Sequence, residues 1–306
     1  MADALNIGVR FALYATLLPL FGFALFGLYA PAGGGIRPGS ELRYHRWLGG
    51  GAVLALGLAA LGVVVMTATM MAVGLGEVHA GDVRAMVTGM SAGTAWIVRI
   101  AALMFLLAGL LIRRPGAMLT VAVTASALAL ASLAWTGHGG MDSGVGGFVH
   151  AAADVVHLLA AGAWLGGLLA LTLLLLRSPA TASHLAFTHR SLARFATVGT
   201  TVVTLIVLTG LINSWLLIGI DRLPTLWTSL YGRLLLVKLA LFAGMLALAA
   251  SNRFRLTPAL GRVLDAPDPT KQLSSLRISL AFESASALAI LAIVAWLGTL
   301  EPPNSM

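Results

Sequence analysis

The chain has 306 residues, of which 59% are hydrophobic and 10% charged, and its mean hydropathy is +0.95. Soluble domains carry charge on roughly a quarter of their residues, so this composition excludes a soluble protein and indicates a polytopic membrane protein. The formal charge of +8 would suggest a nucleic-acid partner in a soluble chain. Here the basic residues lie between apolar runs, where orientation in the membrane explains them, and we expect no nucleic-acid binding.

Apolar runs predict eight membrane-spanning helices, each near the ~20 residues that a ~30 Å hydrocarbon core requires. Turns rich in Gly and Pro separate them, and the turn between the third and fourth runs is only Arg113, Arg114 and Pro115. No hydrophilic stretch is long enough for a separate extramembrane domain. We therefore expect an all-α bundle forming a single transmembrane domain over residues 1–306. The predicted spans are 6–29, 47–72, 94–112, 116–136, 149–176, 195–219, 231–251 and 276–298.

The distribution of basic residues predicts the orientation of the bundle. Assigning alternate loops to opposite sides places most Arg and Lys residues on one side, which the positive-inside rule makes cytoplasmic. Both termini then lie outside, in agreement with an even number of spans. The basic side receives Arg37, Arg43, Arg46, Arg113, Arg114, Arg177, Arg190, Arg194, Arg253, Arg255, Arg262, Lys271 and Arg277.

The fifth predicted span carries a polar stripe on an otherwise apolar helix. His150, Asp154, His157 and Trp164 fall within an arc of roughly 80° at 100° per residue. Ionisable groups inside a membrane span are costly and usually face a bundle interior, so they indicate a functional site. Two imidazoles and a carboxylate one turn apart are a chelating set for a borderline or soft metal.

Further candidate metal ligands converge on the outer half of the predicted bundle. The chain has no cysteine, which excludes thiolate ligands and disulfides. Imidazole suits copper, zinc, nickel and iron, and thioether selects Cu(I), so these residues predict a copper site open to the outside. The alternatives are that the methionines fill the membrane core, that His157 hydrogen-bonds a neighbouring helix, and that the other histidines are loop residues. The additional candidates are His79, His138, Met66, Met70 and Met141.

Three polar residues in the last spans need partners. Lys238 and Asp154 enter from the same side at comparable depth, which makes them a plausible pair. Glu283 lies deeper, as either a second station for a cation or proton, or a structural hydrogen-bonding group. Asn213 is a candidate for lining a cavity or for joining helices.

These residues resemble the copper resistance protein D (CopD) family of bacterial inner-membrane proteins. The resemblance rests on DVVHLLAAGAWLGGL after a GH-containing loop, on LYGRLLLVKLALFAGMLALAASNR, and on a final helix with a glutamate, and its core covers about 149–302. It implies copper handling, with movement of copper from periplasm to cytoplasm beside a small periplasmic copper-binding protein. The positions that match the family pattern are Asp154, His157, Trp164, Asn213, Tyr231, Lys238 and Glu283.

We therefore expect a multi-pass inner-membrane copper importer, not an enzyme, that binds Cu(I) or Cu(II). The chain has no GxxxxGK[ST] phosphate-binding loop, which argues against transport driven directly by ATP. Two other functions fit the residues. One is a membrane redox protein with b-type haem between paired histidines. The other is a sensor or scaffold that binds copper without moving it.

Overall fold

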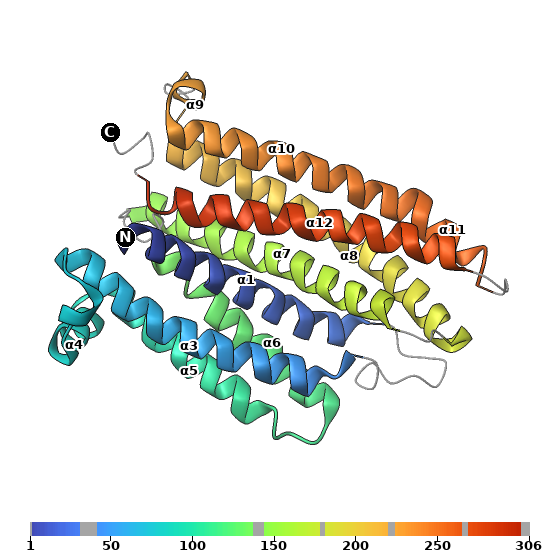
Figure 1. The fold of residues 1–306 in the computed structure, drawn as a ribbon, viewed down its shortest axis with the longest axis horizontal. Coiled ribbons are helices and arrows are strands. Elements are labelled where there is room, and N and C mark those ends of the chain that lie inside the picture. Colours follow the sequence, from blue (N-terminus) through green and yellow to red (C-terminus); the bar gives the residue numbers. More distant parts are fainter. Residues whose placement is uncertain are drawn as a thin grey trace.

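Long helices running alternately in opposite directions form most of the described structure, a computed structural model (Figure 1). It describes residues 2–30, 42–136, 144–177, 181–219, 224–264 and 269–300, and these ranges contain helices and turns but no strand. The all-α expectation is confirmed, and each predicted span coincides with a helix. The long helices are α1 (Ala2–Tyr29), α3 (Tyr44–Met71), α5 (Ser91–Gly109), α6 (Pro115–Ala131), α7 (Gly144–Leu176), α8 (Ala182–Ile218), α10 (Leu230–Ser251) and α12 (Thr270–Leu297).

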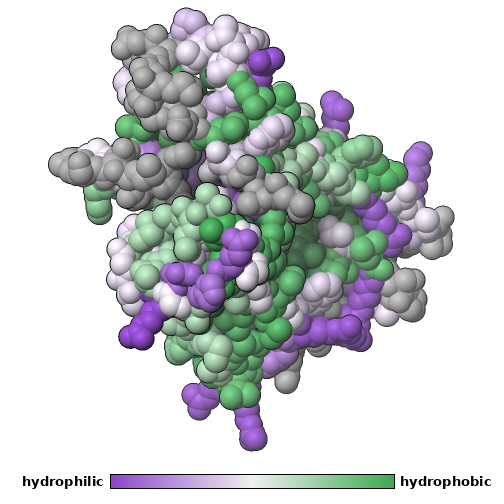
Figure 2. Space-filling model, turned by 60° about the vertical axis from the view of Figure 1, so that its left-hand side comes forward, coloured by the Kyte–Doolittle hydropathy of each residue, from purple (hydrophilic) through white to green (hydrophobic). Residues whose placement is uncertain are grey.

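Among the described helices, seven are long and apolar enough to cross a membrane, and α6 is shorter. It begins at Pro115, directly after the two arginines predicted to form a turn, and has 17 residues. At 1.5 Å per residue it is about 25 Å long. The chain then continues through a turn into the short helix η2 (Ala134–Thr136). The outer surface agrees with a membrane location, since Figure 2 shows broad hydrophobic areas between separate hydrophilic side chains.

Helices α1 and α7 form the centre of the bundle. Helix α1 packs against α3, α6, α7 and α12, and its Gly22 lies against Gly162 and Gly166 of α7. A Cβ added at Gly22 or Gly166 would overlap the backbone of the opposite helix. Glycines spaced as GxxxG allow membrane helices to approach this closely. Around this seam, buried Leu and Phe side chains of α1, α3, α6 and α7 form the main core.

Helix α8 starts well before the predicted boundary at residue 195. Thr181 caps it by accepting a hydrogen bond from the His184 backbone N–H at 3.2 Å, so the polar segment before the span is helical rather than a loop. The loop after α3 also contains a helix, α4 (Ala80–Gly89), and a short turn η1 (Leu75–Glu77). After α10 the chain forms a π-helical turn, η4 (Asn252–Leu256), and a short helix α11 (Thr257–Gly261).

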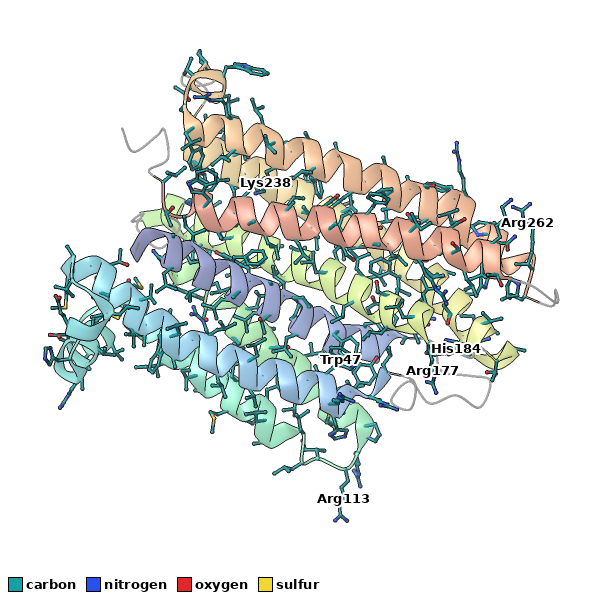
Figure 3. All side chains as sticks on the ribbon, viewed as in Figure 1. Trp47, Arg113, Arg177, His184, Lys238 and Arg262 are labelled. Carbon is teal, nitrogen blue, oxygen red and sulfur yellow. The ribbon has the colours of Figure 1, made fainter. Side chains whose placement is uncertain are left out.

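The two ends of the bundle differ in charge. Figure 3 shows Arg113, Arg177 and Arg262 at the end opposite to the start of α1, and we call this the basic end. Lys238 lies toward the other end, where α1 begins and α12 ends, which we call the terminal end (Figures 1 and 3). The alternation of basic and non-basic turns in the sequence therefore corresponds to two physical ends of the described bundle.

Candidate metal site and polar path

A cavity of about 220 Å³ lies in the terminal half of the bundle, between α1, α7, α8, α10 and α12. We call it the His150 cavity. Most of the predicted polar residues of the central and later helices reach it, although they are far apart in the sequence. Its polar lining residues are Arg10, Tyr14, His150, Asp154, His157, Asn213, Ser214, Tyr231 and Lys238.

Asp154 is held between two helices in this cavity. Its Oδ2 lies 3.9 Å from Nε2 of His150, one turn earlier on α7. Its Oδ1 accepts a 2.6 Å hydrogen bond from Nδ2 of Asn213 on α8. The amide oxygen of Asn213 is buried without a hydrogen-bond partner in the described residues. Buried polar atoms without partners are rare in folded proteins, so this oxygen is a candidate ligand for a cation or acceptor for a water hydrogen.

His157, one turn deeper, is oriented by Thr209 of α8. The two side chains are joined by a 2.9 Å contact between Nδ1 and Oγ1. The Thr209 hydroxyl already donates its one hydrogen to the Leu205 carbonyl at 2.5 Å, so it can only accept from His157. Nδ1 therefore carries the hydrogen, and in the neutral imidazole Nε2 keeps a lone pair. Fixing one ring nitrogen in this way prepares the other for metal ligation.

Lys238 and Tyr231, both on α10, complete the polar lining. Lys238 lines the same cavity as Asp154, but no salt bridge joins the two side chains in the part of the chain that the structure describes. The predicted direct pair is therefore replaced by a shared cavity. Tyr231 is buried at 7% exposure on the first turn of α10.

The side chains that line the His150 cavity include types that bind a borderline metal such as copper. These are not arranged as a closed coordination shell. Imidazole nitrogens and a carboxylate are suitable ligands. However, no three His, Asp or Glu side chains in the described ranges gather closely enough to hold an ion. His150 pairs with Asp154, whereas His157 bonds to Thr209. The described side chains therefore do not form a closed metal centre of the structural kind.

The other predicted ligands lie elsewhere. His79 is exposed at the start of α4, where its backbone N–H donates to Oδ2 of Asp82 at 2.9 Å. Met70 is exposed at 52%, and Met66 lines a different cavity, with Arg10 and Arg99. No described methionine lines the His150 cavity. His138 and Met141 fall outside the described residues.

Glu283 forms a second polar cluster nearer the basic end. It is 1% exposed, and its Oε1 accepts a 2.8 Å hydrogen bond from the indole N–H of Trp164. Its Oε2 accepts a 3.0 Å hydrogen bond from Nδ2 of Asn252. Asn252 begins the π-helical turn η4, and its amide oxygen is buried without a hydrogen-bond partner among described residues. Turns of this kind are frequent at functional sites.

Two further cavities lie along the bundle between and beside the two clusters, and neighbouring cavities share lining residues. A central cavity of about 530 Å³ shares His157 and Lys238 with the His150 cavity and reaches Trp164. On the far side of Trp164 lies the Glu283 cavity, of about 260 Å³, whose lining extends to Arg253 and Thr257 at the basic end. The hydrogen bond between Trp164 and Glu283 lies where the central and Glu283 cavities meet.

Sequence reasoning missed Thr209 and Asn252 as site residues. Thr209 is one turn before Asn213 on the same helix, which was the available signal. Asn252 stands beside Arg253 at the end of an apolar run and resembles a helix-ending residue. Only the fold shows that it reaches Glu283, 31 positions later.

Comparisons with known proteins cover nearly the whole chain. The family model described as the N-terminal domain of copper resistance protein D-like proteins matches residues 1–148, and the model of copper resistance protein D matches 189–297. Neither model covers 149–188, which contains the polar stripe of α7. No solved structure matches the chain.

Two full-length relatives do cover that segment. Copper resistance protein D of Pseudomonas syringae pv. tomato is 39% identical over 305 residues, 99% of this chain and 98% of that protein. The inner membrane protein YebZ of Escherichia coli (strain K12) is 30% identical over 303 residues, 97% of this chain and 98% of that protein. Their names point to a multi-pass inner-membrane protein connected with copper resistance rather than to an enzyme. The chain therefore belongs to the copper resistance protein D family.

Proposed function

We propose that this protein is a copper carrier of the bacterial inner membrane that moves copper from the periplasm to the cytoplasm. It is one transmembrane domain in which all eight long helices cross the bilayer, with both termini in the periplasm. Copper is the transported ion and not a resident cofactor. A small periplasmic copper-binding protein delivers it to the terminal end.

The observation that carries this proposal is the series of cavities along the bundle. Ligands suited to copper, His150, Asp154 and His157, line the cavity in the terminal half. The path continues through the central cavity to Glu283 and ends near Arg253. A sensor or structural metal site requires no such continuation through the membrane, so the extended path favours a carrier.

The residues of the path have separate roles in this mechanism. His157 presents its Nε2 lone pair because Thr209 accepts from Nδ1, and Asn213 holds the Asp154 carboxylate one turn away on the same face of α7. The ion then passes the aromatic barrier of Trp164, whose indole hydrogen bond to Glu283 must open. The membrane potential contributes about 2.3 kcal/mol per charge per 100 mV to inward movement of a cation.

The test begins with copper binding to the purified full-length chain. Wild type is expected to bind copper, and His157→Ala and Asp154→Ala to weaken binding at least tenfold, measured by chelator competition and elemental analysis. His45→Ala is the matched control, since His45 is exposed near the start of α3 at the basic end. Equal copper binding in all four proteins would contradict the proposed ligands, and a Soret band would replace them with a haem site.

Transport is measured separately, with the same proteins in liposomes. Uptake of radioactive copper that saturates and requires Asp154 and His157 is the expected result. Copper binding without uptake would mean that the protein is a sensor or scaffold, and would overturn the proposed transport while leaving the binding site in place.

A further inference from the structure

A separate small cavity in the terminal half is lined by two arginines and, among the described residues, by no acidic side chain. It has a volume of about 70 Å³ and lies between α1, α3, α4 and α5, and we call it the arginine cavity. Arg10 of α1 and Arg99 of α5 both line it, together with Tyr14, Asn6 and Trp96. Neither arginine has a role in the path proposed for the metal.

Arg99 is a buried cation whose observed partners are neutral. Its side chain is 5% exposed. Its Nε donates to Oγ of Ser132 at 3.0 Å and its Nη2 to the Ser132 carbonyl at 3.4 Å. The Ser132 hydroxyl in turn donates to the Ala129 carbonyl at 2.7 Å. A guanidinium stays protonated in proteins, and a buried charge without a counter-charge is costly.

Arg10 is the second arginine in the lining of this cavity, and its guanidinium also packs against Gly298 at the end of α12. Its Nε is buried and has no hydrogen-bond partner among the described residues. The indole N–H of Trp96, which could otherwise donate into the cavity, is bonded to the Ala59 carbonyl at 2.8 Å. The hydroxyl of Tyr14 and the amide of Asn6 remain as neutral donors in the lining.

We propose that a small monovalent inorganic anion of the halide class binds between Arg10 and Arg99. The lining supplies two guanidinium groups and neutral donors but no carboxylate, which is the complement of an anion. The cavity volume is about twice the ~30 Å³ that a water molecule occupies in the liquid. It therefore fits a monatomic anion with its remaining water better than an organic phosphate or carboxylate.

An anion bound at this position would also affect the neighbouring His150 cavity. Arg10 lines the arginine cavity and also the His150 cavity. The Arg10 guanidinium, which stays protonated, therefore places a positive charge beside the cavity that also contains Asp154 and Lys238. An anion beside Arg10 offsets that charge and lowers the electrostatic cost of a cation in the neighbouring cavity. The anion site itself does not depend on which ion is transported.

Equilibrium binding of radioactive chloride to the full-length chain in detergent tests the proposal. The buffer anion is gluconate, and ionic strength is held constant. Wild type is expected to bind about one chloride per chain in a saturable manner, displaced by bromide. Arg10→Gln and Arg99→Gln are expected to weaken chloride binding at least tenfold. Arg84→Gln is the matched control, because Arg84 is exposed on α4 and lies outside the cavity lining.

Two results would overturn the proposal. One is the absence of saturable chloride binding in wild type, and the other is equal chloride binding in wild type and Arg10→Gln. Arg10→Gln decides the question if Arg99→Gln fails to fold, since Arg99 has structural bonds to Ser132.

Discussion

The hydroxyl of Thr209 determines which nitrogen of His157 can reach a metal ion. It donates to the Leu205 carbonyl and accepts from Nδ1 of His157, which leaves Nε2 with a lone pair. We expect Thr209→Val to weaken copper binding by about 10- to 100-fold, the usual effect of removing a residue that orients a metal ligand. Chelator competition on purified protein measures this change.

The control for this variant is Thr197→Val on the same helix. Its hydroxyl is exposed and bonds only to the Ala193 carbonyl one turn earlier in the described structure. Copper affinity should stay at the wild-type value in this protein. Equal affinity in Thr209→Val and Thr197→Val would show that the hydrogen bond does not orient His157 for ligation.

Replacing Glu283 gives a second prediction at this scale, because we expect it to affect copper transport but not copper binding. The carboxyl group lies beyond Trp164, outside the lining of the His150 cavity. We expect Glu283→Gln to bind copper as wild type does and to lower the rate of copper uptake into liposomes at least tenfold. Unchanged uptake would identify Glu283 as a structural hydrogen-bonding group between α7, α12 and η4.

The sequence predicts that two site residues lie close together only when both belong to the same helix. His150, Asp154 and His157 share a face of α7, and helical periodicity alone places them together. Asn213 and Lys238 approach them only through packing between helices, which no local pattern encodes. The same limit explains why Met66, on the same predicted side as the histidines, lies instead beside Arg10 and Arg99.

At the scale of the helices, the close packing of α1 against α7 requires small residues at their contact. A methyl group at Gly166 would overlap the backbone of Gly22. We expect Gly166→Ala to lower the free energy of unfolding by about 1–3 kcal/mol, the typical cost of overpacking. Gly244→Ala on α10 is the control, since nothing lies within 4 Å of the added Cβ. Thermal unfolding in detergent compares them, and equal melting temperatures would contradict the close helix contact.

Helix positions followed from hydropathy, whereas helix ends did not. Every predicted span lies on a helix because an apolar run in a membrane must satisfy its backbone hydrogen bonds within itself. The start of α8 was missed because Thr181 caps a polar segment that hydropathy does not detect. The π-helical turn at Asn252 was missed for a similar reason, since it is defined by backbone bonding and not by composition.

At the scale of the whole molecule, the orientation can be tested by thiol labelling. The chain has no cysteine, so a single introduced cysteine is the one thiol that reacts. We expect a thiol at Glu77→Cys to react with an impermeant maleimide added from the periplasm, and thiols at Arg113→Cys and Lys271→Cys to be protected until the membrane is opened. Glu77, Arg113 and Lys271 are all exposed. The alternation of helix directions in Figure 1 gives this pattern.

The pair Arg113 and Lys271 tests the short helix α6 in particular. The two positions are separated by four long helices, α6, α7, α8 and α10. Both positions lie on the same side of the membrane only if an even number of these helices cross it. Labelling of Lys271→Cys, but not Arg113→Cys, from the periplasm would show that α6 does not cross. Labelling of Arg113→Cys and Lys271→Cys but not Glu77→Cys would reverse the proposed orientation.

The glycine contact between α1 and α7 also determines which parts of the bundle can move. Two helices that touch through their backbones cannot slide or rotate without collision, so α1 and α7 form a fixed frame. In the part of the chain that the structure describes, no glycine of α8 or α10 lies against the backbone of α1 or α7. Helices α8 and α10 flank the central cavity, and Leu211, Trp215 and Leu239 in its lining are exposed on the outside of the bundle. For the proposed carrier, we therefore expect opening to move α8 and α10 relative to a stationary α1–α7 pair.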